Sequence, residues 1–435
     1  MVLKTFWETW KWNYLVWQNQ LLMISKAFSP ENRSRSFLIL VASLGYFVDI
    51  YDLLIFSIVR EPSLKSLLVP DAEIVNASAK IINWQMFGLL LGGILWGIMG
   101  DKRGRLSVLF GSILLYSIAN FLNGFVQTVD QYAGLRFVTG IGLAGELGAG
   151  ITLVSEMMPK SKRGIMTSFI TGVGVFGAVL AYLLFDLTKD WRMCYMIGGG
   201  LGILLLLLRV SVSESAMFRK VATHVERGNL LKLFTTPALV KKYVLAILVG
   251  VPSWFIVGIL ITLSNRFAME LYEGSAVVAG ACVMYGYIGN AMGDITVGLI
   301  SQYYQSRKKA LYFMYAACIL AVSFYFSPLN NSDTTMYICC FFLGYASGFW
   351  AIIVTMGAEH FGTNMRATAA TTIPNMVRGS LPLMNLLFNN YFIHSLHWSM
   401  VKSGIVTGVI VIGIALVALV KTEETFHKDL DYLEE

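Results

Sequence analysis

Apolar runs of about twenty residues recur along the whole chain, and no other feature constrains its fold as strongly. A helix needs roughly 20 apolar residues to cross the hydrocarbon core of a bilayer, and lipid leaves the backbone no partners outside a helix or a closed barrel. The runs predict an all-α membrane protein with twelve transmembrane helices at residues 36–59, 81–99, 106–126, 132–157, 166–186, 192–209, 243–264, 277–301, 309–327, 335–358, 367–392 and 403–420.

The composition favours the same class. Hydrophobic residues make up 56% of the 435 residues and charged residues 14%, and the mean hydropathy is +0.65. A soluble chain of this length has too little core to bury so much apolar surface. The five cysteines lie in apolar runs without metal-ligand spacing, so we expect packing roles for them and no bound metal.

The basic residues indicate the orientation of the chain. The net charge is +7, but the lysines and arginines cluster in short loops between apolar runs, which argues against a nucleic-acid partner. Most of them fall on one side of the predicted membrane, and the other side holds only Arg60, Lys65, Lys80, Lys189, Arg192, Arg266 and Lys402. This bias predicts that both termini are cytoplasmic.

Residues 1–35 carry four tryptophans among charged residues and lack the apolar core of a cleaved signal peptide. Two interpretations of this segment remain open. It is either a helix lying along the membrane interface or a partly ordered tail.

Glycines recur with equal spacing in the second and eighth spans, as Gly88, Gly92 and Gly97 and as Gly289, Gly293 and Gly298. The exits of the fourth and tenth spans also match, with Glu156 and Arg163 spaced as Glu359 and Arg366. A duplicated six-helix unit explains both matches, and such repeats place a substrate site between the halves. The predicted domains are an N-terminal segment 1–35, a six-helix bundle 36–209, a cytoplasmic linker 210–242, a second bundle 243–420 and a cytoplasmic tail 421–435.

The loop after the second span combines glycines with charges, in the order Gly97, Gly100, Asp101, Lys102, Arg103, Gly104 and Arg105. It resembles the signature loop of the major facilitator superfamily, with Lys102 in place of the first arginine. The fourth span, from Arg136 through Glu146 to its exit, is similar to the sugar-porter and metabolite:proton symporter branches. Asp49, Tyr51 and Asp52 resemble the first-span pattern of aromatic-acid and related organic-anion:proton symporters. The resemblance covers residues 36–420 and implies two pseudo-symmetric six-helix bundles.

Charged residues near this loop can pair across helix ends. Asp101 can accept hydrogen bonds from a neighbouring helix N-terminus, and nearby arginines can pair with Asp101 or Glu156. We predict a cytoplasmic gate that is closed in one state and broken in the other, made of Asp101, Arg103, Arg105, Glu156, Arg163, Glu359 and Arg366. The alternative is that these charges only set the orientation. After the eighth span Gln302 stands where an aspartate would, which weakens any matching carboxylate latch.

Several ionisable residues fall inside predicted spans, where each costs roughly 2.5 kcal/mol or more and so calls for a partner or a use. Asp49 and Asp52 share a helix face, and two carboxylates on one dry face cannot both ionise easily. Asp52 and Arg136 lie at similar depths, and the sugar porters that this stretch resembles use such a pair for proton coupling. We predict proton-coupling roles for Asp52, Asp49, Arg136 and Glu146. A static ion pair between Asp52 and Arg136 is the alternative.

Arg378 lies near the middle of the eleventh span, between Pro374 and Pro382. A guanidinium group binds a carboxylate bidentately, and the organic-anion branch that the chain resembles tends to carry an arginine here. We therefore predict that Arg378 binds an anionic substrate. The alternative is an internal partner for Asp294 or Glu146, although we expect Asp294 to be structural. Further substrate-binding candidates, each of which packing alone would also explain, are Asn375, Trp254, Tyr285, Tyr287, Asn290 and Trp350.

These observations predict a secondary active transporter of the inner membrane that takes up a small organic anion with protons by alternating access. We expect no cofactor besides the proton as coupling ion, no partners except lipid and substrate, and function as a monomer. The sequence has no phosphate-binding loop and no catalytic or metal constellation, which argues against ATP-driven transport and against an enzyme. A proton-coupled exporter, an anion exchanger and a non-transporting sensor of the same fold remain alternatives.

Overall fold

The protein is described by a computed structural model that covers residues 33–70, 73–146, 148, 150, 166, 169–209, 234 and 236–428. In these residues the regular structure is helical throughout. Eight of the helices in this part of the chain are long and apolar enough to cross a membrane.

The first half contains α2 (Arg33–Ser66), α3 (Ile74–Arg103), α4 (Arg105–Asn123), α5 (Val129–Leu143), α8 (Gly177–Thr188) and α9 (Trp191–Arg209). The second half begins with α12 (Pro237–Phe255), which continues as the π-helix η2 (Ile256–Ile261), and with α13 (Ser264–Leu271) and α14 (Ala279–Tyr303). It goes on with α15 (Arg307–Tyr325), α16 (Asp333–Ser347), α17 (Trp350–His360) and α18 (Arg366–Gly379). It ends with α19 (Leu381–Asn385), the π-helix η3 (Leu386–Ser395) and α20 (Met400–Lys421).

Each predicted span overlaps one of these helices, although the end of the fourth span and the start of the fifth lie outside the described residues. Both bundles begin a few residues earlier than predicted, and α2 already starts at Arg33. The predicted linker extends to residue 242, but α12 begins at Pro237, so Lys241 and Lys242 belong to the helix. Proline is favoured at the first position of a helix. Lysines at a helix end can hold their ammonium groups in water while their aliphatic chains lie along apolar surface.

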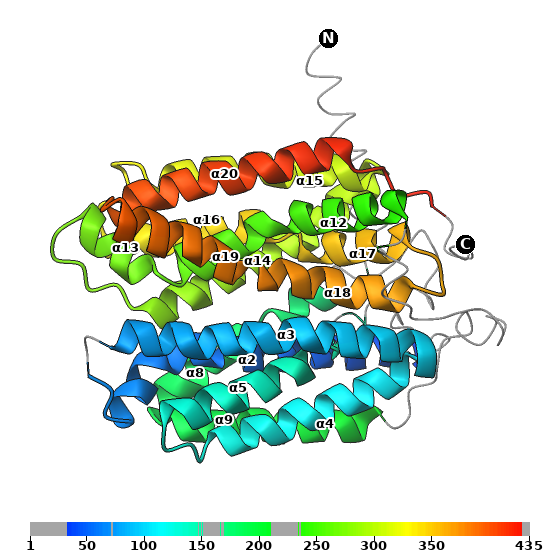
Figure 1. Cartoon of the computed structure of the whole chain (residues 1–435), viewed down its shortest axis with the longest axis horizontal. Coiled ribbons are helices and arrows are strands. Elements are labelled where there is room, and N and C mark those ends of the chain that lie inside the picture. Colours follow the sequence, from blue (N-terminus) through cyan, green and yellow to red (C-terminus); the bar gives the residue numbers. More distant parts are fainter. Residues whose placement is uncertain are drawn as a thin grey trace, which may run out of the picture.

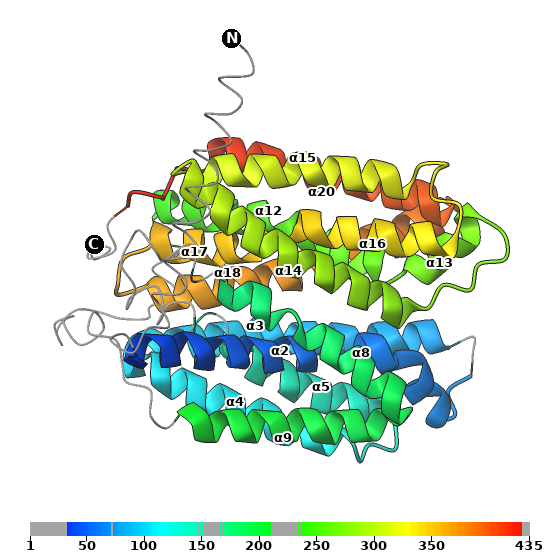
Figure 2. The same ribbon diagram turned by 180° about the vertical axis from the view of Figure 1, so that it is seen from behind.

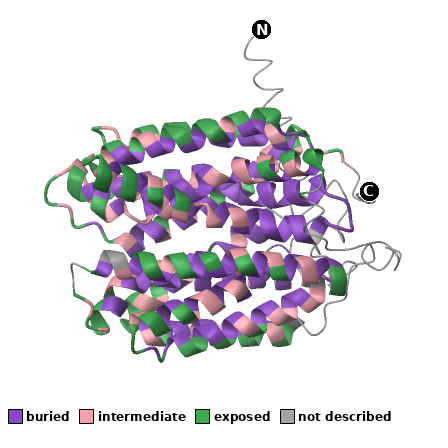
Figure 3. Cartoon of the chain, in the orientation of Figure 1, coloured by how far each residue is buried: buried purple, intermediate pink, exposed green. Residues whose placement is uncertain are grey.

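The helices form two bundles stacked side by side, with the first half below and the second half above in Figure 1. Along the seam, α3 packs against α18 on one side of the molecule (Figure 1), and α14 packs against α2 and α8 on the other (Figure 2). Many side chains on the outward faces of α4, α9 and α20 are exposed, and buried residues gather toward the interior (Figure 3). Exposed leucines such as Leu204 and Leu207 suit a surface that faces lipid.

The repeated glycines hold equivalent helix pairs together in the two halves. A Cβ on Gly88 of α3 would lie 2.2 Å from the carbonyl oxygen of Phe137 in α5. A Cβ on Gly289 of α14 would lie 2.0 Å from the carbonyl oxygen of Phe341 in α16. Small residues let membrane helices approach this closely, so the same contact recurs in both halves.

Capping side chains and a glycine determine where several helices begin and end. Thr128, Ser306, Ser332 and Ser399 cap α5, α15, α16 and α20 by accepting a backbone N–H of the first turn. Gly104 separates α3 from α4 with a φ of 95°, a conformation that side chains disfavour. The glycine of the signature loop thus forms the sharp connection at which Asp101 lies.

Candidate functional site

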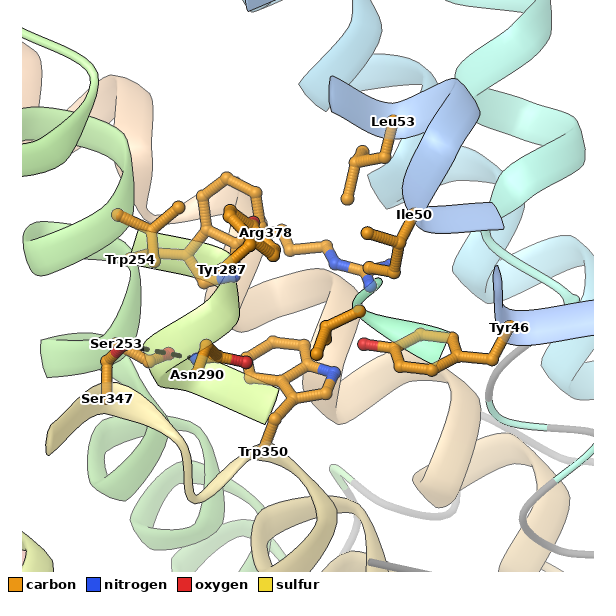
Figure 4. Close-up of a pocket in the computed structure, with 12 residues that line it drawn as sticks. Tyr46, Ile50, Leu53, Ser253, Trp254, Tyr287, Asn290, Ser347, Trp350 and Arg378 are labelled. Atoms are coloured by element: carbon orange, nitrogen blue, oxygen red, sulfur yellow. Dashed lines mark hydrogen bonds between the residues drawn. The ribbon is translucent and has the colours of Figure 1, made fainter. Parts of the chain in front are cut away.

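A small cavity lies on the seam between the two halves. Its volume is about 30 Å³, enough for about two water molecules. The described residues that line it come from both halves: Tyr46, Ile50, Leu53, Val175, Ser253, Trp254, Val257, Tyr287, Asn290, Ser347, Trp350 and Arg378. Figure 4 shows the α2 residues on one side and the second-half residues on the other, with the Arg378 guanidinium group between them.

Arg378 is the one charged side chain among these described lining residues. It is 3% exposed, its Nη1 donates to Asn375 Oδ1 at 3.2 Å, and its guanidinium carbon lies 5.2 Å from the centre of the Trp350 ring. Its Nε has no hydrogen-bond partner, and it forms no ion pair within the described residues. A buried cation without a counter-ion is costly, so the cavity presents a positive charge that an anion would neutralise.

Neither acidic residue considered as an internal partner of Arg378 forms an ion pair with it in the described structure. Asp294 is fully buried, and its Oδ1 accepts the backbone N–H of Ala351 at 3.1 Å, in the first turn of α17. A carboxylate at that position satisfies an orphan donor and complements the helix dipole. The structural role of Asp294 stays a prediction, which this contact supports. Glu146 is buried and does not line the cavity.

The structure brings Asp52 and Arg136 together, but the predicted ion pair between their side chains is absent. The Nη2 of Arg136 donates to the backbone carbonyl of Asp52 at 2.7 Å, and the rest of the guanidinium group binds Gln85 Oε1 at 3.2 Å and Asn120 Oδ1 at 3.0 Å. Three neutral acceptors therefore satisfy the arginine. Asp52 is fully buried, and neither of its carboxyl oxygens makes a hydrogen bond. Asp49 is buried one helical turn away and does not line the cavity.

At the end of the bundle where Asp101 lies, called here the Asp101 end, the two halves are in contact. Asp101 is buried, and its Oδ2 accepts the backbone N–H of Thr368 at 2.7 Å, near the start of α18. Nearby, a Cβ on Gly97 would lie 3.0 Å from Thr368 Cα, and one on Gly148 would lie 2.5 Å from Thr371 Cα. Backbone this close leaves no passage between α3 and α18 at the Asp101 end.

Arg103 is exposed and forms no ion pair in the described part of the chain, and its predicted partner Glu156 lies outside that part, so its gate role stays a prediction. Its position on the last turn of α3 directs it to the surface. Glu156, Arg163 and the Arg105 side chain lie outside the described residues.

The second half has an ionic cluster at the same end. Glu359 pairs with Arg307, with Oε1 at 2.9 Å from Nη2, and it accepts the Thr425 hydroxyl at 2.7 Å. Arg366 instead donates to the backbone carbonyl of Ala358 at 3.1 Å. Burial alone would raise the pKa of Glu424, but hydrogen bonds from Ser306 and several backbone N–H groups outweigh it and lower that pKa. These hydrogen bonds therefore attach the segment after α20 to the loop between α14 and α15.

A larger cavity of about 720 Å³ lies between the halves at the opposite end, called here the Arg60 end. Helices α2 and α3 line it from the first half, and η2, α13, α19 and η3 from the second. The described structure is thus closed between α3 and α18 at one end and hollowed at the other, as expected for one state of an alternating-access protein.

Some predicted substrate residues lie outside the central cavity. Tyr285 is 39% exposed and its ring lies 5.4 Å from that of Tyr337. Asn375 donates to the backbone carbonyls of Ala144 and Thr371 and holds Arg378 through its oxygen. Asn375 therefore positions Arg378 and does not line the space itself.

The prediction missed the α2 contribution to the cavity. Tyr46, Ile50 and Leu53 line it at intervals of four and three residues, which place them on one helix face. This spacing on one helix face is the sequence signal from which their position at the cavity could have been predicted. Ser253 and Ser347 were also missed, and each lies near a predicted residue, Trp254 or Trp350.

Comparison with known proteins identifies the fold. The family model described as Major Facilitator Superfamily matches residues 42–382. The chain belongs to this superfamily. Among solved structures, the proton:xylose symporter XylE, bound to 6-bromo-6-deoxy-D-glucose, is similar with a TM-score of 0.72 at 16% identity, covering 91% of this chain and 97% of the other. The predicted architecture of twelve helices in two pseudo-symmetric bundles is confirmed.

Two curated relatives indicate the kind of protein. A putative metabolite transport protein of Haemophilus influenzae is 26% identical over 78% of this chain and 84% of the relative. A probable 4-methylmuconolactone transporter of Cupriavidus pinatubonensis is also 26% identical, over 79% of this chain and 80% of the relative. The Major Facilitator chain described here is accordingly a multi-pass secondary transporter of a small molecule and not an enzyme.

Proposed function

We propose that the protein takes up a small organic anion together with protons, by alternating access of the seam cavity to the two sides of the inner membrane. The observation that carries the proposal is the state of Arg378. It is a buried cation between the two halves, held by a neutral amide and an aromatic ring, with one N–H unused. A carboxylate would supply the missing charge and acceptor.

The surroundings of Arg378 suit an organic acid with an apolar body. Trp254 and Trp350 line the space beside the guanidinium group, and ligand sites commonly combine apolar walls with a few polar groups. One relative is named as a probable 4-methylmuconolactone transporter, so a relative's name already points to a small organic substrate. At about 30 Å³ the cavity must widen before such a molecule can occupy it.

Asp52 supports proton coupling. Its carboxyl group is buried near Arg136 without a direct bond to that charge, so protonating it breaks no ion pair. A buried carboxyl that can change its charge is what a coupling ion requires, and no other cofactor is needed. The bias of basic residues supports a cytoplasmic location for the Asp101 end and for both termini.

The test is a binding screen with a chemical control. Purified protein is heated with a panel of aromatic and aliphatic carboxylic acids and with the matching neutral amides. We expect some acids, and none of their amides, to raise the unfolding temperature, because only the acid pairs with Arg378. Arg378→Ala should lose this effect, and Arg103→Ala, which removes an exposed arginine, should keep it.

Retained stabilisation by the acids in Arg378→Ala would make the arginine structural and remove the basis for an anion carrier. Transport in sealed vesicles then separates the alternatives. A sensor binds the acid without accumulating it, and an anion exchanger accumulates it only against a counter-anion. An exporter accumulates it only with the proton gradient reversed.

A further inference from the structure

The cavity at the Arg60 end contains charges that the proposed mechanism has not used. Arg60 from the first half and Arg266 from the second both line it. Lys80 lines it too, but Lys80 is paired with Asp130. Glu61 is the one carboxylate among the described lining residues. Two unpaired cations, one from each half, therefore face the same space.

Arg60 is the unusual member of this pair. It is 7% exposed, yet its guanidinium group has no hydrogen bond and no ion pair within the described residues, and the neighbouring Glu61 does not pair with it. A cation this buried needs compensation, and Arg60 lines the large cavity. Arg266 repels it and Glu61 attracts it across that space. An anion entering the cavity would satisfy both arginines.

The cavity also lies on the route to Arg378. Gly258 lines the large cavity and its chain neighbour Val257 lines the central one. A Cβ on Gly258 would lie 2.6 Å from Leu381 Cδ1, so the Leu381 side chain packs directly against the segment that separates the two spaces. A metabolite fits a volume of about 720 Å³ and does not fit one of about 30 Å³. In this state an anion can therefore reach the arginines of the large cavity but not Arg378.

We infer that Arg60 and Arg266 form a separate entry site for organic carboxylates, where the anion is captured before Leu381 yields and Arg378 receives it. The inference rests on the proposed function for the identity of the anion. A pair of like charges at a cleft raises the local concentration of counter-ions and their association rate, and salt weakens the effect. The entry site raises the rate at which the anion is captured and does not change its equilibrium affinity for the Arg378 site.

The test measures the charge preference of the cavity without using a substrate. Asn389 lines the cavity, and Asn389→Cys provides a thiol there, while the five native cysteines are all buried. The full-length protein in nanodiscs is treated with anionic sulfonatoethyl methanethiosulfonate or cationic trimethylammonioethyl methanethiosulfonate. We expect the ratio of the modification rate by the anionic reagent to that by the cationic reagent to fall about tenfold when Arg60→Gln and Arg266→Gln are combined. When both arginines are present, this ratio should fall as the salt concentration rises.

Two controls make the result specific. Arg60→Lys keeps the charge and should keep the ratio. Lys402→Gln removes a charge near the same end but outside the cavity lining, and it should also leave the ratio unchanged. An unchanged ratio in the double glutamine variant would overturn the entry site, and so would an equal fall in Lys402→Gln.

A second measurement separates this inference from the proposed function. For a carboxylate that stabilises the protein, Arg60→Gln with Arg266→Gln should raise KM for uptake severalfold and leave kcat and the equilibrium affinity unchanged. A loss of equilibrium affinity would merge these arginines with the Arg378 site and refute a separate entry site. Failure of the acid screen with a retained reagent ratio would refute the anion carrier alone.

Discussion

Three buried charged residues inside the bundles have different sets of partners. Arg136 binds three neutral acceptors, and Asp294 caps α17 through Oδ1 while its Oδ2 has no hydrogen-bond partner within the described residues. Arg378 has one neutral partner, a ring and an unused N–H. Since an ion in a membrane protein is costly unless it is compensated, the incomplete compensation of Arg378 supports the proposed anion site at the scale of a single residue.

Asp52 leads to a prediction at the same scale. Asp52→Asn removes the carboxyl group proposed to gain and lose the proton, but it keeps the size of the side chain and the backbone bond to Arg136. We expect acid-gradient-driven accumulation in sealed vesicles to fall to background, while exchange of labelled for unlabelled anion continues. Labelled uptake measured with and without a pH gradient checks this.

The control for Asp52 is Asp130→Asn, which changes an exposed aspartate on the first turn of α5. It should leave accumulation intact. Unchanged gradient-driven accumulation in Asp52→Asn would remove Asp52 from the coupling mechanism.

At the scale of elements, the two halves use the same contact between helices. Gly88 on α3 and Gly289 on α14 each face a backbone carbonyl of the neighbouring helix. A carbonyl cannot move aside as a flexible side chain does, so an added methyl group forces the helices apart, and overpacking of this kind costs about 1–3 kcal/mol.

We therefore expect Gly88→Ala and Gly289→Ala to lower the unfolding temperature in detergent by similar amounts. Gly134→Ala on α5 is the matched control, because nothing lies within 4 Å of its added Cβ. Alanine favours helix over glycine, so the control should match or exceed the wild type. Equal melting of all three variants would show that the close contacts contribute little.

At the scale of the whole molecule, we expect the contact at the Asp101 end to control which side of the membrane can reach the seam. Asp101 joins the end of α3 to the start of α18. Hydrogen bonds to charged groups contribute about 1.5–3 kcal/mol, so Asp101→Ala should raise the population open at that end about tenfold or more.

The measurement uses Thr372→Cys, which is a fully buried position on α18 beside Gly97. We expect Asp101→Ala to speed its labelling by a polar maleimide. Asp333→Ala is the control, because Asp333 binds Ala276 within the second half only. Equal labelling rates in the two variants would mean that Asp101 does not hold the halves together.

Much of this molecule could be predicted from its sequence because membrane helices have strong signals. Hydropathy located the spans, and the glycines and the signature loop revealed the repeat and the superfamily. The site was predicted in part, since Trp254, Tyr287, Asn290, Trp350 and Arg378 line the cavity. Tyr285 and Asn375 do not, because the rotation of a helix about its axis depends on its packing partners. The hydropathy pattern of the spans does not reveal that Arg136 donates to the backbone carbonyl of Asp52 and not to its carboxyl group.

The unequal sizes of the two cavities have a consequence for inhibition. A rigid acid that fills the space of about 720 Å³ is too large for the space of about 30 Å³, so it would hold the two halves apart at the Arg60 end. It would bind only the form hollowed at the Arg60 end and draw the population toward it. Such an inhibitor would work from one face of a vesicle, and its sidedness would report which way the protein had inserted.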